Sequence, residues 1–160
     1  MSFAYDVKKD LCDGKKSHKR CCQLAELYGT MLFSHCFEEN KIHLVSENRL
    51  VPDHFVSRLQ EVLRVEAKVE QKNQQGAYHV YVEDPAKLHK IWEKLGIQRV
   101  DDTGELAIDR SLLQKTCCVA AFLRGVFLVC GTISNPEKGY HLEFSSPHRH
   151  LSGCLFALLW

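Results

Sequence analysis

The chain has almost no net charge, and this absence limits what it can bind by electrostatics alone. Its 160 residues include 21 Lys and Arg against 20 Asp and Glu, a formal net charge of +1. A domain dedicated to nucleic acid is usually clearly basic, because each phosphate that it neutralises releases counterions. The overall charge therefore argues against strong DNA binding by this chain alone, although it allows a local basic patch.

Long apolar runs are also missing. No stretch approaches the ~18 residues of a membrane-spanning helix, and residues 1–14 carry acids and lysines in place of the apolar core of a signal peptide. Eight cysteines without a secretion signal favour a cytoplasmic compartment in which thiols stay reduced. We therefore expect no membrane partner, and cysteines that are buried, inert and packed as small hydrophobic residues.

What the chain does contain is the composition of a globular domain, with 45% hydrophobic and 26% charged residues. Apolar residues at helical spacing predict helices over 3–12, 21–33, 50–63 and 87–95. Four other segments have strand character, at 36–37, 42–46, 65–71 and 77–84. The last two alternate apolar and polar residues around a polar turn, so we expect them to form a hairpin.

Two segments of the chain repeat one another 96 positions apart. Residues 19–35, KRCCQLAELYGTMLFSH, align without gaps to residues 115–131, KTCCVAAFLRGVFLVCG, and seven of the seventeen positions are identical. A strand, a turn and a second strand are expected after each segment. Vicinal cysteine pairs and single glycines in register are poorly explained by shared hydrophobic composition, so we infer a duplicated unit.

Small residues occupy matching faces of the two repeated helices. Glycine in a helix interior costs about 1 kcal/mol relative to alanine, so packing should offset that cost. Ala25 and Gly29 lie four residues apart on one helical face, as do Ala121 and Gly125. We therefore expect the two helices to pack closely against each other across a pseudo-twofold axis.

The residues of these helices resemble a known family. The segments LYGTMLFSH (27–35) and LRGVFLVCG (123–131) are similar to the paired LAGLIDADG helices of homing endonucleases. Three segments are closer still to one branch, the WhiA family: MSFAYDVKKDL, RCCQLAEL and AFLRGVFLVCGTISNPEKGYHLEF. WhiA proteins are bacterial regulators that join a degenerate homing-endonuclease domain to a helix-turn-helix. The resemblance covers about residues 1–150.

This resemblance implies an α+β fold of the LAGLIDADG homing-endonuclease type. Two α-β-β-α-β-β-α repeats, the second incomplete, would place antiparallel sheets on either side of the paired central helices. The expected organisation is an N-terminal helix and basic loop at 1–16, a first repeat at 17–98, a linker at 99–109 and the incomplete second repeat at 110–160. A C-terminal helix-turn-helix is expected in the full-length protein and is not seen in this chain.

The resemblance also bears on catalysis. In an active LAGLIDADG nuclease the eighth motif position is an acid in each helix, and the two acids hold divalent metal at the scissile phosphates. The matching positions here are Ser34 and Cys130. Mg²⁺ prefers carboxylate oxygens, and a neutral hydroxyl and a thiol do not supply that charge. We therefore expect a degenerate nuclease fold with no catalytic residues and no enzymatic activity.

Eight cysteines and nine histidines raise the question of a zinc site. Structural zinc sites usually show paired cysteines or histidines a few residues apart. Here the cysteines form vicinal pairs at 21–22 and 117–118, where neighbouring helical side chains point in different directions. The sequence pattern therefore predicts no metal site and no cofactor.

DNA contact by the sheets is the main functional hypothesis, since nucleases of this type lay their sheets in the major groove. The outward strand residues here mix bases with acids, and each acid would repel phosphate. A basic run also precedes the first repeated helix. The candidate DNA-contacting residues are Lys15, Lys16, Lys19, Arg20, Lys41, His43, Lys68, Lys138 and His141.

Two classes of function remain open. In the first, the chain is a DNA-binding module that extends the footprint of a separate helix-turn-helix, which makes the main contact with double-stranded DNA. In the second, it is a protein-interaction scaffold whose sheet face takes a protein partner and makes no DNA contact. The resemblance favours the first, and implies a monomeric, nucleoid-associated transcription regulator of sporulation, cell division, the cell cycle and chromosome segregation. The mixed charge of the sheet favours the second for this chain alone.

Overall fold

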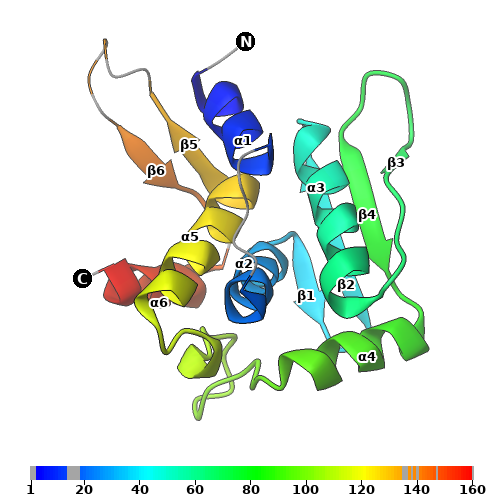
Figure 1. The fold of residues 1–160 in the computed structure, drawn as a ribbon, viewed down its shortest axis with the longest axis vertical. Helices are drawn as coiled ribbons and strands as arrows, with labels where there is room; N and C mark the ends of the chain where they lie inside the picture. Colours follow the sequence, from blue (N-terminus) through cyan, green and yellow to red (C-terminus); the bar gives the residue numbers. More distant parts are fainter. Residues whose placement is uncertain are drawn as a thin grey trace.

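The computed structural model describes residues 3–13, 19–134, 137, 139, 141–146 and 148–159 (Figure 1). Its helices are α1 (Phe3–Asp13), α2 (Arg20–Leu32), α3 (Leu50–Arg58), α4 (Pro85–Leu95), α5 (Thr116–Cys130) and α6 (Arg149–Leu159). A π-helical turn, Leu59–Leu63, extends α3, and a short 3₁₀ turn, Arg110–Leu112, precedes α5. The strands are β1 (Cys36–Glu38), β2 (Lys41–Ser46), β3 (Glu70–Gln71), β4 (Tyr78–Val82), β5 (Gly131–Ile133) and β6 (Leu142–Phe144).

The repeated helices α2 and α5 lie side by side at the centre of the molecule (Figure 1). A Cβ atom added at Gly29 would come well under 3.0 Å from the backbone oxygen of Phe122, and one added at Gly125 equally close to the backbone oxygen of Glu26. Real Cβ atoms do not make such contacts. The predicted close packing of the two helices through their glycines is therefore confirmed.

Polar contacts also cross this helix pair. The Thr30 hydroxyl donates a hydrogen bond to the Gly125 oxygen at 3.2 Å. The Glu26 carboxylate lies 3.7 Å from Arg124 on α5 and 2.7 Å from the ring of His54 on α3. Burial opposes ionisation of Glu26, but the hydrogen bond from His54 and the charges of His54 and Arg124 bring the pKa of that carboxyl below its usual value. Glu26 therefore links three helices.

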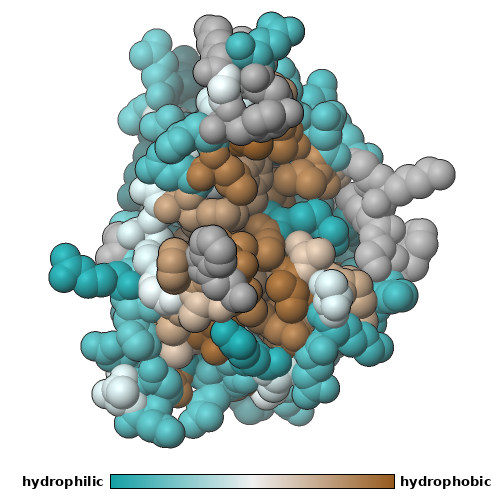
Figure 2. Space-filling model, turned by 90° about the vertical axis from the view of Figure 1, so that its left-hand side faces the viewer, coloured by the Kyte–Doolittle hydropathy of each residue, from teal (hydrophilic) through white to brown (hydrophobic). Residues whose placement is uncertain are grey.

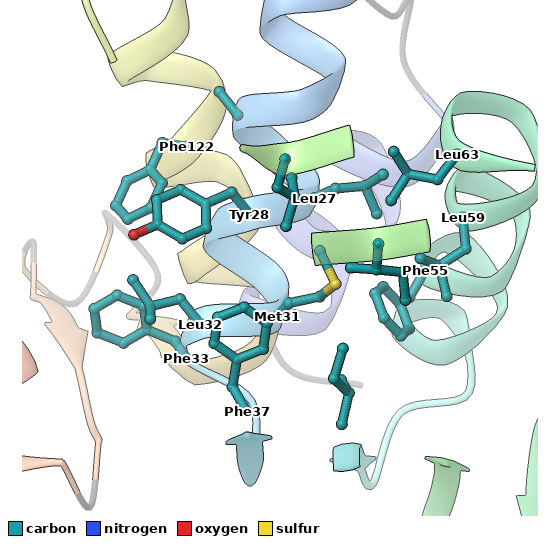
Figure 3. Close-up of a cluster of buried hydrophobic side chains, with 14 of the residues drawn as sticks. Leu27, Tyr28, Met31, Leu32, Phe33, Phe37, Phe55, Leu59, Leu63 and Phe122 are labelled. Carbon is teal, nitrogen blue, oxygen red and sulfur yellow. The ribbon is translucent and has the colours of Figure 1, made fainter. Parts of the chain in front are cut away.

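Two antiparallel sheets flank the central helices, as expected. One has four strands in the order β1-β2-β4-β3, and the other pairs β5 with β6. The inward face of the four-stranded sheet contributes Phe37, Ile42, Leu44, Val80 and Val82 to the core. Figure 3 shows that core, in which Leu27 and Met31 of α2 lie toward Phe55 of α3 and Leu59 of the π-helical turn. Tyr28 lies on the other side of α2, against Phe122 of α5.

The predicted strand 65–71 is wrong over most of its length, because only Glu70 and Gln71 pair with β4. Arg64 has a left-handed backbone, φ 56°, which turns the chain out of the π-helical turn. The amines of Lys87 and Lys90 on α4 then donate to the backbone oxygens of Glu66 and Arg64. The Glu66 carbonyl, which lies within the predicted strand, thus bonds a lysine in place of a neighbouring strand.

The other predicted elements are present with small changes of boundary. Helix α4 begins where the Asp84 carboxylate accepts a hydrogen bond from the Ala86 amide, and it ends at Gly96, whose φ is +58°. Between the repeats, the hydroxyl of the buried Tyr28 accepts a hydrogen bond from the Asp109 amide at 2.7 Å. The same hydroxyl lies 3.5 Å from the Ala107 oxygen, so the linker is anchored to the core through α2.

One face of the molecule is strongly apolar. Figure 2 shows hydrophobic side chains gathering on the side that carries β5, β6 and α6. A hollow on this side is lined by five apolar residues and two serines: Phe33, Phe144, Leu155, Phe156, Leu159, Ser146 and Ser152. Phe156 is 64% exposed and Leu142 57% exposed. Among the described residues, no helix combines the length and the apolar character needed to cross a membrane.

Candidate functional site

The ends of the central helices hold Ser34 and Cys130, the two positions at which the resemblance predicts acids in an active nuclease. Ser34 follows the end of α2 and is buried; its hydroxyl lies 2.6 Å from the Met31 oxygen and 3.0 Å from the Cys36 oxygen. The Cys130 thiol, at the last position of α5, lies 3.3 Å from the Val126 oxygen. Both side chains are thus directed to neighbouring backbone carbonyls.

A lysine lies close to the second of these positions. Lys8 of α1 has its amine 5.6 Å from the centre of the Phe127 ring. Burial raises the pKa of the Cys130 thiol to about 11, although the nearby Lys8 charge acts in the opposite direction. A protonated thiol and an ammonium group do not attract a divalent cation. Among the described residues, no group of three or more carboxylates and imidazoles is arranged to hold a metal here.

The outward face of the four-stranded sheet carries a cluster of imidazole and phenol rings. Nε2 of His43 on β2 lies 2.9 Å from Nδ1 of His79 on β4. The His43 ring stacks on that of Tyr81, with ring centres 4.2 Å apart, and it meets His35 edge-on at 5.0 Å. We call these four residues, His35, His43, His79 and Tyr81, the ring cluster.

Two lysines flank the ring cluster. The amines of Lys41 and Lys72 lie 5.6 and 5.9 Å from the centre of the Tyr81 ring. Acids are close in the same sheet, since Glu38 pairs with Lys41 across β1 and β2, and Glu70 pairs with His79 across β3 and β4. The face therefore combines two ammonium groups with stackable rings, and carboxylates stand at its edge.

His43 does not have the exposed, base-reading role expected for it. It is only 8% exposed, beneath its neighbours in the ring cluster. Burial lowers the pKa of His43 to about 4, and the charges of His35, His79, Lys41 and Lys72 act in the same direction. At neutral pH, His43 is therefore an uncharged ring that supports the exposed His35 and the half-buried Tyr81.

The remaining DNA-contact candidates do not lie together. The Arg20 guanidinium donates to the Val62 oxygen at 3.1 Å and so fastens α2 to the π-helical turn. His141 is exposed on the two-stranded sheet, 3.2 Å from Glu143. Lys19 and Lys68 are exposed, whereas Lys15, Lys16 and Lys138 lie outside the described residues. Of the predicted lysines that the structure describes, only Lys41 lies beside the ring cluster, and its second neighbouring lysine, Lys72, is not among the predicted residues.

The expectation that the vicinal thiols diverge is wrong. The sulfur atoms of Cys21, Cys22, Cys117 and Cys118 all lie within 4.8 Å of one another. All eight cysteines of the chain are described and are thiols, but only three are buried as expected; the other five are half-buried: Cys21, Cys36, Cys117, Cys130 and Cys154. The internal repeat contained the signal: two close-packed helices that start with the same cysteine pair must bring the two pairs together.

Comparison with known proteins agrees with this fold. A family model described as the WhiA LAGLIDADG-like domain matches residues 119–159. The "probable cell division protein WhiA" of Lachnoclostridium phytofermentans is 30% identical over 161 residues, covering 92% of this chain and 50% of that protein. The protein of the same name from Bacillus cytotoxicus is 32% identical over 169 residues, covering 99% of this chain and 52% of that protein. The chain thus spans about half the length of the curated relatives that it matches.

Two crystal structures share the fold. One is the N-terminal LAGLIDADG domain of DUF199/WhiA, with a TM-score of 0.63 and 17% identity over 91% of this chain and 67% of that chain. The other is full-length DUF199/WhiA from Thermatoga maritima, with a TM-score of 0.62 and 19% identity over 90% of this chain and 44% of that chain. The paired helices, the two sheets and these similarities agree: the chain belongs to the WhiA family and has its LAGLIDADG-like domain.

Proposed function

We propose that this chain is a noncatalytic, homing-endonuclease-like module of a WhiA-type DNA-binding regulator, and that the outward face of its four-stranded sheet contacts duplex DNA. The observation that carries the proposal is the ring cluster between Lys41 and Lys72. Ammonium groups bind phosphate oxygens, and imidazole and phenol groups can hydrogen-bond the DNA backbone or base edges. Two cations are few, so the contact is auxiliary to a stronger one elsewhere in the protein.

The wider role follows from the relatives. They are named probable cell division proteins, and we extend that role to the protein from which this chain comes. Within it, we place the main DNA contact in a helix-turn-helix outside this chain, and we assign the whole protein to transcription regulation in sporulation, cell division and chromosome segregation. The domain described here would then lengthen the DNA footprint.

The helix ends support the proposed absence of catalysis. An active enzyme of this fold needs carboxylates where this chain has Ser34 and Cys130, and both of these side chains are bonded to backbone carbonyls. Incubation of the purified chain with duplex DNA and Mg²⁺ is expected to leave the DNA intact. Metal-dependent cleavage that disappears in a Ser34→Ala/Cys130→Ala variant would show that the nuclease is active.

DNA contact is tested by fluorescence anisotropy with a short duplex across a series of salt concentrations. We expect binding at low salt with a small log–log slope. A Lys41→Ala/Lys72→Ala variant should reduce the magnitude of that slope by about 2, since each lost phosphate contact contributes about 0.9. The matched control, Lys94→Ala/Arg110→Ala, removes the same charge from exposed positions outside the sheet and should leave the slope unchanged. If both double variants reduced the slope equally, the result would contradict a DNA contact localised at Lys41 and Lys72.

The alternative is a protein-interaction scaffold, and the apolar face in Figure 2 favours it. Contiguous exposed apolar surface, here including Leu142, Phe156 and Leu159, often marks a site of protein contact. The same titration separates the two functions. If the chain fails to bind any duplex at low salt, the sheet makes no DNA contact and the scaffold becomes the better description.

A further inference from the structure

The four clustered thiols come from equivalent places in the two repeats. Helix α2 starts at Arg20 and α5 at Thr116, so Cys21 and Cys22 occupy the second and third positions of one helix and Cys117 and Cys118 those of the other. Each helix supplies one half-buried and one buried thiol. The pseudo-twofold axis between the helices therefore generates a group of four sulfur atoms, each within 4.8 Å of the other three.

The number and type of donors fit one class of metal. Four thiolates are soft ligands that suit Zn²⁺ in tetrahedral geometry, at Zn–S distances of about 2.3 Å. That geometry requires sulfur–sulfur separations of about 3.8 Å, as follows from the same Zn–S distance. Small side-chain rotations would contract a cluster that already lies within 4.8 Å to this size. Four protein ligands leave no open position, which is the arrangement of a structural site.

The local electrostatics act in opposite directions on the two thiols of α5. All four cysteines lie in first helical turns, where free amide groups and the helix dipole stabilise negative charge. A hydrogen bond from Cys22 and the charges of Lys19 and Lys115 lower the pKa of Cys117. Burial raises the pKa of Cys118 to about 12, so in the absence of a metal ion this thiol keeps its proton. Metal binding would displace that proton, as it does at other thiolate sites.

We propose that Cys21, Cys22, Cys117 and Cys118 bind one Zn²⁺ as a tetrathiolate site that joins the two repeats. The site lies at the N-terminal ends of α2 and α5, opposite the ends that carry Ser34 and Cys130. Its role is structural: by linking the helices at their starts, it fixes the angle at which the two sheets flank them. Farther along α2 and α5, the contacts of Gly29 and Gly125 already bring the two helices together.

The test begins with the chain as it is expressed, purified under reducing conditions without added metal. Elemental analysis by plasma mass spectrometry is expected to find one zinc per chain. Replacement of zinc by Co²⁺ should give the intense sulfur-to-cobalt charge-transfer and ligand-field bands of a tetrahedral tetrathiolate. Absence of stoichiometric zinc, together with no such spectrum on Co²⁺ addition, would overturn the proposal, and this measurement needs no variant.

Variants then locate the metal. Cys21→Ser/Cys117→Ser removes the half-buried sulfur from each helix and should lose the bound zinc and the cobalt spectrum. Cys36→Ser/Cys154→Ser removes two half-buried thiols outside the cluster and should keep both. Retention of the metal by the first variant would contradict the site. Two disulfides between the helices, found by mass spectrometry of the freshly purified, unreduced chain, would also contradict the site. Oxidised sulfurs do not bind Zn²⁺ as thiolates.

Discussion

Gly29 and Gly125 make the same contact in opposite directions: each lies against the backbone oxygen of the residue three positions before the other. Gly29 faces Phe122, Gly125 faces Glu26, and both pairs follow the 96-residue offset of the internal repeat. A reciprocal contact of this kind requires a local twofold axis between α2 and α5. It also leaves no room for a side chain at either position.

Replacing Gly29 with alanine is expected to destabilise the chain. The added methyl would meet the backbone of α5, which cannot move aside as a flexible side chain can, so the two helices would have to separate. Overpacking of this kind usually costs about 1–3 kcal/mol, and it should exceed the gain of about 1 kcal/mol in helix propensity. Urea unfolding followed by circular dichroism measures the difference.

Gly153→Ala provides the matched control, because nothing lies within 4 Å of a Cβ atom at that position of α6. The propensity gain should appear there without a clash, so this variant should be slightly more stable than the parent chain. Equal stabilisation by Gly29→Ala and Gly153→Ala would mean that the central helices do not approach as closely as described.

The Tyr28 hydroxyl should stabilise the linker between the repeats. Tyr28→Phe removes the acceptor for the Asp109 amide and the donor to the Ala107 oxygen, and an unmade buried hydrogen bond costs about 1–3 kcal/mol. Hydrogen exchange should show faster exchange of the Asp109 amide. Tyr78→Phe, at a half-buried tyrosine of β4, should leave that amide unaffected. Unchanged protection of Asp109 in Tyr28→Phe would refute the anchoring role.

Stability should fall as the solution becomes acidic, partly because of His43. Its pKa is about 4 in the folded chain and 6.5 in the ordinary imidazole, so between these values the unfolded chain binds a proton that the folded chain does not. The free energy of unfolding therefore decreases as the pH falls from 6.5 to about 4. The other titratable groups facing His43 are His35, His79, Tyr81, Lys41, Lys72 and the paired Cys36.

The His43→Phe variant isolates this effect, because it keeps an aromatic ring in the stack and cannot bind a proton. Its unfolding free energy, measured by urea titration at several pH values, should depend less on pH over that interval. His89→Phe replaces an exposed imidazole on α4 and should retain the parent slope. An unchanged slope in His43→Phe would show that His43 is not the group responsible.

The central architecture was predictable because a sequence repeat encodes it directly. Identical residues 96 positions apart specify matching helices, and their glycines specify how closely these approach. The alternation of residues 65–71 was a weaker guide. Val65 is buried and its neighbours are exposed, as in a strand, but the carbonyl of Glu66 accepts a hydrogen bond from Lys87 of α4. Which partner a backbone group takes depends on distant residues that a local pattern does not contain.

The candidate sites were harder to predict for the same reason. His43 alternates with buried neighbours on β2, which suggests an exposed side chain, yet rings from β4 and from residue 35 cover it. The cysteine cluster is not evident from either vicinal pair alone, because each pair lies in its own helix. The four sulfurs meet only when the two helices are placed side by side, so their proximity belongs to the repeat rather than to either motif.

The ion pair between Glu26 and Arg124 shows what joining two such units in one chain permits. In an isologous dimer every contact occurs twice, so a residue and its symmetry mate are always identical. Here the positions equivalent to Glu26 and Arg124 hold Phe122 and Tyr28, two aromatic residues whose ring centres lie 5.4 Å apart. The same contact is therefore an ion pair on one side of the pseudo-twofold axis and an aromatic pair on the other. Because both repeats lie in one chain, the two sides of this pseudo-symmetric interface can carry different residues, while the glycines between them keep the symmetry.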